Sequence, residues 1–321
     1  MKYIKICHIL TANPYKEIGG TPVAASFIIK HEGEQQSIVK HGIGYGLFKT
    51  IIYPFLLAIR IAISDFDLVH IHDPQGYWYT FLPKFLKKKI IYTSHGETTE
   101  YYKVMRPVGT VEKIKAKMAV AIQKRLITQA DVVVAVSEAV KASIIKYYDI
   151  KPEKVVVIYN GVDTKKFTSL KKKTKNIALW VGTNSEVKGL EKAIEYAKKH
   201  KMKLRIVGID GKSREKMEFL GRVAYDRMPE IYNSANVLLY FSTNDGHPLV
   251  PLEAMACGLD VIASRESNIE IIPQEKDGTY KISGSKALKI VKNYDWSIQA
   301  RKYIKLYKQT IVTSVCKCDN I

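Results

Sequence analysis

Short apolar runs alternate with longer polar segments along the whole chain of 321 residues. The runs at 67–72, 130–137, 177–182 and 237–241 have the length and composition of buried strands. The segments between them carry apolar residues at helical spacing, which predicts helices that cover a sheet. Regular alternation of strand and helix indicates βαβ units, so the pattern predicts an α/β fold with doubly wound parallel sheets.

One charged run interrupts this alternation, Lys171-Lys172-Lys173-Thr174-Lys175. Its composition is that of a solvated linker. It separates an N-terminal domain, 1–167, from a C-terminal domain, 168–294, and each half is long enough for a domain of ordinary size.

The most informative stretch is 242–264, which reads S-T-N-D-G-H-P-L-V-P-L-E-A-M-A-C-G-L-D-V-I-A-S and lies between two predicted strands. We expect a loop, then a helix that begins near Pro251 and ends at Gly258. The loop follows a parallel strand at its carboxyl end, where open α/β sheets bind ligands. Free N–H groups at the helix start attract phosphate, and Glu253, in the predicted first turn, can accept both hydroxyls of a ribose.

The same residues also have ordinary structural explanations, which the sequence alone leaves open. Glu253 can simply complement the helix dipole, and Gly246 can simply form a turn. His95 stands at the end of the predicted strand 90–96, where it can contact a ligand or serve as a buried hydrogen-bonding group. Gly19 and Gly20 stand at a strand-to-helix turn, which allows close approach of a ligand or only a tight turn.

The stretch 242–264 resembles the retaining glycosyltransferases of family four, the group that includes glycogen synthases and phosphatidylinositol mannosyltransferases. Their signature is a pair of glutamates eight positions apart; Glu253 matches the second, and Asp245, one methylene shorter, occupies the first. Asn160-Gly161-Val162-Asp163 and Lys188-Gly189 match further family motifs in the same order. The resemblance implies a GT-B fold, with two Rossmann-like domains facing a central cleft and a C-terminal helix, 295–310, that packs back on the first domain.

The resemblance also implies roles for individual residues. Glu253 would hold the ribose, Lys188 the diphosphate and Asp245 the sugar, while His95 would approach the anomeric carbon. The donor-binding set would comprise Gly19, Gly20, Thr183, Val223, Gly246, His247, Pro248 and Leu249. Relatives carry an arginine where this chain has Thr183, and a hydroxyl binds diphosphate far less strongly than a cation does.

The activity implied is retaining transfer of a sugar from a nucleotide sugar, such as a UDP- or GDP-sugar, to an unknown glycan, lipid-linked or protein acceptor. No cofactor and no metal would be required, because Lys188 and helix N–H groups supply the positive field. Thr183 and Asp245 motivate an alternative, a degenerate member that binds a nucleotide sugar or glycan without turnover. A sugar-nucleotide epimerase, which shares the fold, is a further alternative.

Charge adds a prediction about partners. Lys and Arg number 51 against 31 Asp and Glu, and a net charge of +20 indicates an anionic partner. A nucleic-acid-binding protein would satisfy this, but the motifs are those of a ligand cleft and no nucleic acid is expected. Region 84–125 is strongly basic and also carries an apolar stripe at helical spacing, formed by Val111, Ile114, Met118, Ile122 and Leu126.

Two interpretations of region 84–125 stay open. The stripe can cover the sheet beneath a solvated basic face, or the region can contact an anionic membrane or a lipid-phosphate acceptor. The longest apolar run, 51–63, is shorter than the roughly 20 residues that a spanning helix needs. Cys7 and Cys257 read as buried apolar residues, and no signal peptide is visible. We therefore expect a cytoplasmic protein, with peripheral membrane contact as an additional possibility.

Overall fold

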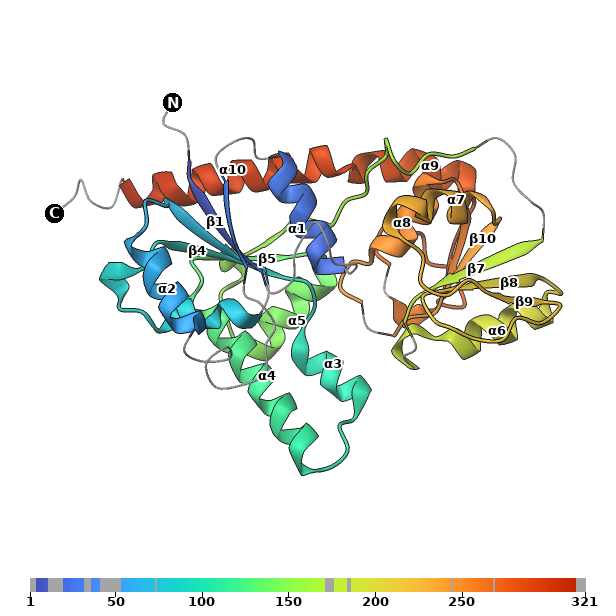
Figure 1. Cartoon of the computed structure of the whole chain (residues 1–321), viewed down its shortest axis with the longest axis horizontal. Coiled ribbons are helices and arrows are strands. Elements are labelled where there is room, and N and C mark those ends of the chain that lie inside the picture. Colours follow the sequence, from blue (N-terminus) through green and yellow to red (C-terminus); the bar gives the residue numbers. More distant parts are fainter. Residues whose placement is uncertain are drawn as a thin grey trace. The chain divides into compact units, whose positions relative to one another are not determined.

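The computed structural model describes residues 4–10, 20–31, 36–40, 53–72, 74–170, 176–183, 186–243, 245–267 and 269–315. The chain divides into two compact units (Figure 1), the first comprising Met1–Tyr159 with Gln299–Ile321 and the second comprising Asn160–Ile298. Gly19, the 171–175 linker and the terminal Cys316 and Cys318 lie outside the described residues.

The first unit contains a six-stranded sheet in the order β2-β1-β3-β4-β5-β6. Every pairing in it is parallel, as the alternation of strand and helix predicts. The strands are β1 (Ile6–Leu10), β2 (Gln36–Lys40), β3 (Leu68–Ile71), β4 (Lys89–Ser94), β5 (Val132–Ala135) and β6 (Val155–Val157). The helices are α1 (Gly20–His31), α2 (Tyr53–Ile63), α3 (Thr98–Met105), α4 (Thr110–Gln129) and α5 (Glu138–Tyr148).

The second unit contains another six-stranded sheet, in the order β12-β11-β10-β7-β8-β9. Its pairings are parallel except at the edge, where β12 runs antiparallel to β11. The strands are β7 (Ile177–Val181), β8 (Lys203–Val207), β9 (Met217–Phe219), β10 (Val237–Tyr240), β11 (Asp260–Ala263) and β12 (Tyr280–Ile282). The helices are α6 (Leu190–Lys199), α7 (Met228–Asn233), α8 (Leu249–Ala256) and α9 (Gly284–Val291).

A long final helix, α10 (Trp296–Val315), begins in the second unit and continues in the first. In the first unit it packs against the sheet, because the Tyr307 hydroxyl lies 2.8 Å from His70 Nδ1 on β3. Tyr303 and Tyr307 are both buried there. The predicted class, α/β with parallel sheets, is confirmed in both units.

Local signals in the sequence explain several element ends. Ser137 caps α5 by accepting a hydrogen bond from the Val140 N–H at 3.1 Å. Gly258 has a φ of +71° directly after α8, and a Cβ there would lie 2.6 Å from Ser169 Oγ. Glycine is therefore required at this turn, and the predicted helix stop is confirmed.

One predicted helix starts earlier than expected. The helix of the 242–264 stretch begins at Leu249, two residues before Pro251, which occupies its third position, where a backbone N–H has no intrahelical partner anyway. Glu253 consequently lies in the second turn instead of the first. Residues Pro74–Phe81 form a 3-10 segment after β3.

The motif Asn160-Gly161-Val162-Asp163 is fixed within the second unit. The Val162 N–H donates to Tyr294 O at 2.9 Å, and the Trp296 N–H donates to Val162 O at 3.1 Å. A Cβ on Gly161 would lie 2.8 Å from both Tyr294 O and the Trp296 ring, so the two segments pack too closely for a larger residue.

Candidate functional site

The strongest polar contact between predicted site residues joins Lys188 to Asp245. Lys188 ends the 3-10 segment Glu186–Lys188 after β7, and Asp245 lies in the loop after the neighbouring parallel strand β10. Lys188 Nζ is 2.8 Å from Asp245 Oδ1 and 2.9 Å from Oδ2. The hydroxyl of Tyr240, at the end of β10, donates to the same carboxylate. Both charged side chains are partly buried, as expected for a ligand site at the carboxyl edge of a sheet.

Backbone contacts hold these two loops together. The Trp180 indole N–H donates to Lys188 O at 3.0 Å, and the Thr243 N–H donates to Val187 O at 2.9 Å. Gly189 has a φ of +64°, and a Cβ there would lie 2.3 Å from Phe241 O. The family motif Lys188-Gly189 thus needs its glycine for close backbone packing. This packing fixes the position of the Lys188 backbone.

The amino terminus of α8 adjoins Asp245 in sequence. Pro248 stands at its N-cap and makes no side-chain cap hydrogen bond. The start of this helix therefore offers backbone N–H groups and the positive end of a dipole to an anion. The preceding residue is anchored, because Asn160 Nδ2 donates to His247 O at 2.7 Å. Burial lowers the pKa of the His247 imidazole to about 3, so its side chain is neutral at physiological pH.

Glu253 is buried in the second turn of α8. Its Oε2 accepts a hydrogen bond from the Tyr232 hydroxyl at 2.7 Å. Burial raises the pKa of the Glu253 carboxyl to about 7, although the hydrogen bonds from Tyr232 and Tyr225 act in the opposite direction. This carboxyl therefore changes its charge near neutral pH, which is characteristic of functional sites but also occurs in structural networks.

The other predicted donor-binding residues of the second unit contribute less to the candidate site than Lys188 and Asp245 do. Thr183 follows β7 and is exposed. Val223 is partly buried and packs against the same hydrophobic cluster as Leu249. Gly246, Pro248 and Leu249 are partly buried along the loop into α8. Lys188, Asp245 and the start of α8 therefore form the core of the candidate site.

The remaining predicted residues belong to the first unit. Gly20 is the first residue of α1, which follows β1 along the chain. His95 follows β4, and its Nε2 is buried with no hydrogen-bond partner among the described residues. Burial lowers the pKa of the His95 imidazole to about 4. An unpaired buried ring nitrogen is costly in a folded protein, so this atom is a candidate for contact with a ligand.

A buried polar network that the sequence did not reveal holds the loop of His95. Glu97 is buried and caps α3 by accepting hydrogen bonds from Thr99 N and Glu100 N at 2.7 Å each. The Tyr148 hydroxyl donates to Glu97 Oε1 at 2.6 Å, and Gln123 Nε2 donates to Gly96 O at 2.8 Å. In the sequence, Glu97 followed by two threonines is an unusual helix cap, so it indicates this network only weakly.

Three buried histidines lie together on one face of the first sheet. His8, on β1, and His70 and His72, at β3, place ligand atoms within 4.8 Å of one another. His8 Nδ1 is 3.0 Å from His72 Nε2, and His70 bonds to Thr93 and Tyr307 through its two ring nitrogens. His70 is thus fully hydrogen-bonded without an ion. His8 joins this cluster because β1 and β3 pair in parallel with His8 opposite His70.

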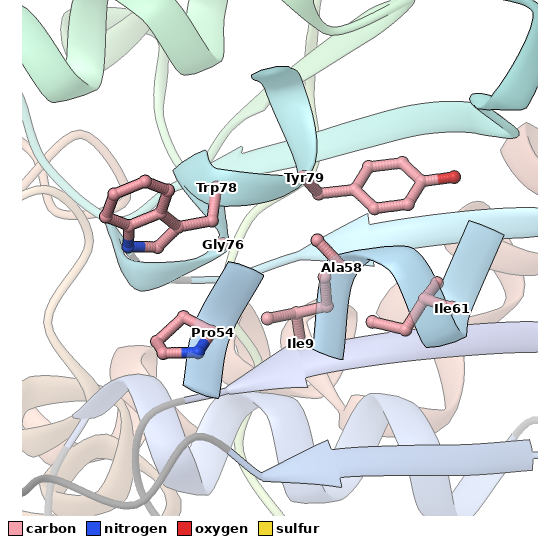
Figure 2. Close-up of a pocket in the computed structure, with 7 residues that line it drawn as sticks. All are labelled: Ile9, Pro54, Ala58, Ile61, Gly76, Trp78 and Tyr79. Atoms are coloured by element: carbon pink, nitrogen blue, oxygen red, sulfur yellow. The ribbon is translucent and has the colours of Figure 1, made fainter. Parts of the chain in front are cut away.

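One small gap lies apart from all these residues, between β1, α2 and the 3-10 segment of the first unit (Figure 2). Its lining contains no carboxylate, histidine or lysine that could recognise a phosphate, so it offers no alternative donor site. The lining residues are Ile9, Pro54, Ala58, Ile61, Gly76, Trp78 and Tyr79. No helix among the described residues combines the length and the apolar character needed to cross a membrane.

Comparison with known proteins gives consistent results over nearly the whole chain. Residues 20–166 match the family model described as Glycosyltransferase Family 4, and residues 161–311 match the model described as Glycosyl transferases group 1. An O-antigen chain mannosyltransferase of Salmonella typhimurium is 28% identical over 216 residues, which cover 59% of this chain and 60% of that protein. An uncharacterized glycosyltransferase of Methanocaldococcus jannaschii is 26% identical over 252 residues, 68% of this chain and 63% of that protein. The matched stretches thus span about three fifths of the length of these two curated relatives.

Solved structures establish the fold. A sucrose-phosphate synthase from Thermosynechococcus elongatus superimposes with a TM-score of 0.78 at 17% identity, covering 97% of this chain and all of that one. The Anabaena protein HepE, solved in complex with UDP-glucose, gives a TM-score of 0.64 at 16% identity, covering 98% of this chain and all of that one. Both comparisons support a GT-B fold built from two Rossmann-like domains. Because the two family models together account for residues 20–311, the chain belongs to the group 1 glycosyltransferases of family four.

Proposed function

We propose that this protein is a retaining hexosyltransferase that moves a sugar from a nucleotide-sugar donor to an acceptor. The observation that carries the proposal is the pairing of Lys188 with Asp245 beside the start of α8. A lysine ammonium next to unfilled helix N–H groups is suited to a diphosphate leaving group. The structural relative HepE, solved with UDP-glucose, supports a nucleotide sugar as the donor.

In the proposed reaction, the bond between the anomeric carbon and the diphosphate oxygen breaks, and the electron pair leaves with the nucleoside diphosphate. The acceptor hydroxyl forms the new bond on the same face of the sugar, and its proton passes to the departing diphosphate oxygen. Lys188 and the N–H groups of α8 stabilise the charge that develops on the leaving group. A divalent metal is not needed in this scheme, because these cationic and dipolar groups would supply the positive field.

Within this proposal, Asp245 exchanges partners during donor binding. The diphosphate takes Lys188, and the released carboxylate contacts hydroxyls of the sugar. Glu253 would accept hydrogen bonds from the ribose hydroxyls when it is ionised. The roles that the resemblance implies for His95 and Gly20, in the first unit, stay predictions.

The test is a thermal-shift screen of UDP- and GDP-sugars, followed by a transfer assay with the sugars that bind. A ligand that binds the folded state raises its melting temperature. We expect a shift with one nucleotide class, loss of that shift in Lys188→Ala, and an α-configured product from an α-configured donor. Failure of every nucleotide sugar to shift the melting temperature, or a product of inverted configuration, would contradict the proposal.

A second candidate is a degenerate protein that binds a nucleotide sugar without transferring it. It is favoured by Thr183, which places an exposed hydroxyl where relatives have an arginine. Under this alternative, the donor binds, but the protein neither transfers its sugar to an acceptor nor hydrolyses it with water. Thr183→Arg separates the two candidates further: it should tighten nucleoside diphosphate binding in both, but increase turnover only in an active enzyme.

A further inference from the structure

The helical hairpin formed by α3 and the first half of α4 exposes apolar side chains that nothing in its unit covers. Helix α3 has no buried residue, and the first buried residue of α4 is Ala116. Val108, in the turn between the helices, is 81% exposed, and Val111 and Met118 are 65% and 58% exposed. In Figure 1 this hairpin extends away from the sheet of its own unit.

The exposed residues on α4 belong to the predicted stripe, and of the two interpretations left open, the one in which the stripe covers the sheet is wrong for its first half. At 3.6 residues per turn, Ile114 and Met118 each lie about 160° around the helix from Ala116. The side of α4 that approaches the body of the unit is therefore opposite to the stripe. The stripe becomes buried only near the end of the helix, at Leu126.

Most exposed large apolar side chains of the first unit fall into two groups, one on α2 and the residues between β3 and β4, and one on the hairpin. Among the described residues, the exposed large apolar side chains all lie between residues 53 and 118, except Leu170 and Val312. Soluble proteins rarely leave a contiguous apolar surface open unless it binds something. The other side of the hairpin adds to this surface, since Val104 and Met105 at the end of α3 are each 44% exposed and Val108 follows them in the turn.

The charges around the hairpin define its partner. Lys113, Lys115 and Lys117 are exposed, and none of them forms an ion pair with a carboxylate among the described residues. A backbone hydrogen bond leaves the charge of a carboxylate in place, so the acids of the hairpin count against its cations. Between residues 97 and 118 five cations outnumber three carboxylates: Lys103, Arg106, Lys113, Lys115 and Lys117 against Glu97, Glu100 and Glu112. The apolar surface is therefore bordered by a net positive charge.

We infer that this hairpin docks on an anionic lipid bilayer, with its apolar side chains among the acyl-chain ends and its lysines among the headgroups. A basic helix with exposed aliphatic residues is suited to lie in a membrane interface. A second copy of the chain would bring like charges together, and a nucleic acid would gain little from valine, isoleucine and methionine. The inference deepens the proposed function, on which it rests only for the idea that the acceptor is met at the membrane.

The experiment is co-sedimentation of the full chain with phosphatidylcholine vesicles, with and without phosphatidylglycerol. Met118→Glu is compared with Leu170→Glu, which makes the same charge change at a side chain of equal exposure, 58%, in the other unit. We expect the wild type to bind the anionic vesicles, Met118→Glu to lower vesicle affinity at least about fivefold, and Leu170→Glu to leave it nearly unchanged. Lys113→Gln/Lys117→Gln should weaken binding to anionic vesicles and reduce its salt dependence.

The inference is overturned if the wild type stays in the supernatant with anionic vesicles, or if the two glutamate variants lose binding equally. It is also overturned if the wild type forms a dimer that Met118→Glu dissociates, because a second copy would then cover the surface. Nucleotide-sugar thermal shifts are measured on the same preparations. Vesicle binding without any donor shift would refute the proposed donor chemistry alone, and a donor shift without vesicle binding would refute the docking alone.

Discussion

The ammonium of Lys188 contacts both carboxylate oxygens of Asp245, at 2.8 and 2.9 Å, although the two residues are 57 positions apart in the chain. The cation proposed to hold the donor diphosphate is thus neutralised by the residue proposed to contact the sugar. A partly exposed pair of this kind is worth about 1 kcal/mol or less. A diphosphate, with its larger charge, can therefore displace the carboxylate.

The first prediction follows from this competition. Asp245→Asn removes the competing anion but keeps the size of the side chain, so free nucleoside diphosphate should bind about three- to tenfold more tightly. Transfer from the nucleotide sugar should fall, because the carboxylate is no longer there to contact the sugar. Calorimetric titration with the diphosphate and an initial-rate assay with the nucleotide sugar measure the two effects.

Asp245→Glu is the matched control for this experiment, because it restores the residue that the family signature has and keeps the charge. It should bind the free diphosphate with nearly wild-type affinity and retain transfer. Unchanged diphosphate affinity in Asp245→Asn would mean that the pair does not oppose donor binding.

The second prediction concerns pH and Glu253. Burial raises the pKa of this carboxyl to about 7, above its ordinary value of 4.5. A raised folded-state pKa contributes stability that is complete below about pH 4.5 and is lost as pH rises through 7. The loss amounts to about 3 kcal/mol. Glu253→Gln, which cannot ionise, should therefore gain stability relative to the wild type between pH 5 and 8 in denaturant titrations.

Donor binding should show the opposite trend if ionised Glu253 holds the ribose. Affinity should rise as pH increases through about 7 and become flat above it. Tyr232→Phe removes a hydrogen bond that lowers the pKa of Glu253, so the midpoint should move to higher pH. A midpoint that stays in place in this variant would separate the pH dependence from Glu253.

The third prediction tests the backbone packing that positions Lys188. Gly189→Ala puts a Cβ at a φ of +64° and 2.3 Å from Phe241 O, so it should destabilise the second unit by at least about 2 kcal/mol. It should also weaken diphosphate binding by displacing Lys188. Gly96→Ala is the control, since a Cβ there meets no atom within 4 Å. Equal melting temperatures for the two variants would contradict the packing argument.

The fourth prediction concerns the loss of folding stability at acid pH. Burial lowers the pKa of His95 to about 4, so below pH 6.5 the unfolded chain takes up a proton that the folded chain excludes. Stability should fall as pH decreases from 6.5 to 4, by about 3 kcal/mol from this residue. His95→Asn should make the melting temperature less dependent on pH across this range. His200→Asn makes the same substitution at an exposed histidine of the other unit and is the matched control.

The amino-acid sequence by itself determined the secondary structure and the order of the motifs. Apolar runs such as Val132–Ala135 can only be buried strands in an alternating chain, and their parallel pairing follows from the helices between them. Ser137 and Gly258 marked their helix ends because capping and left-handed backbone are local properties of those residues. Lys188, Asp245 and Glu253 were identified because they stand in short motifs that resemble those of family four, and a motif is a local property of the sequence.

Only the tertiary structure decided what each of these side chains contacts. Contacts across long separations, such as Lys188 with Asp245 or Tyr232 with Glu253, depend on which loops adjoin at a sheet edge and how deeply a helix is buried. The α4 stripe gives the clearest case. Helical periodicity shows that Val111, Ile114 and Met118 share a face, but it carries no information about whether the fold supplies anything to cover that face.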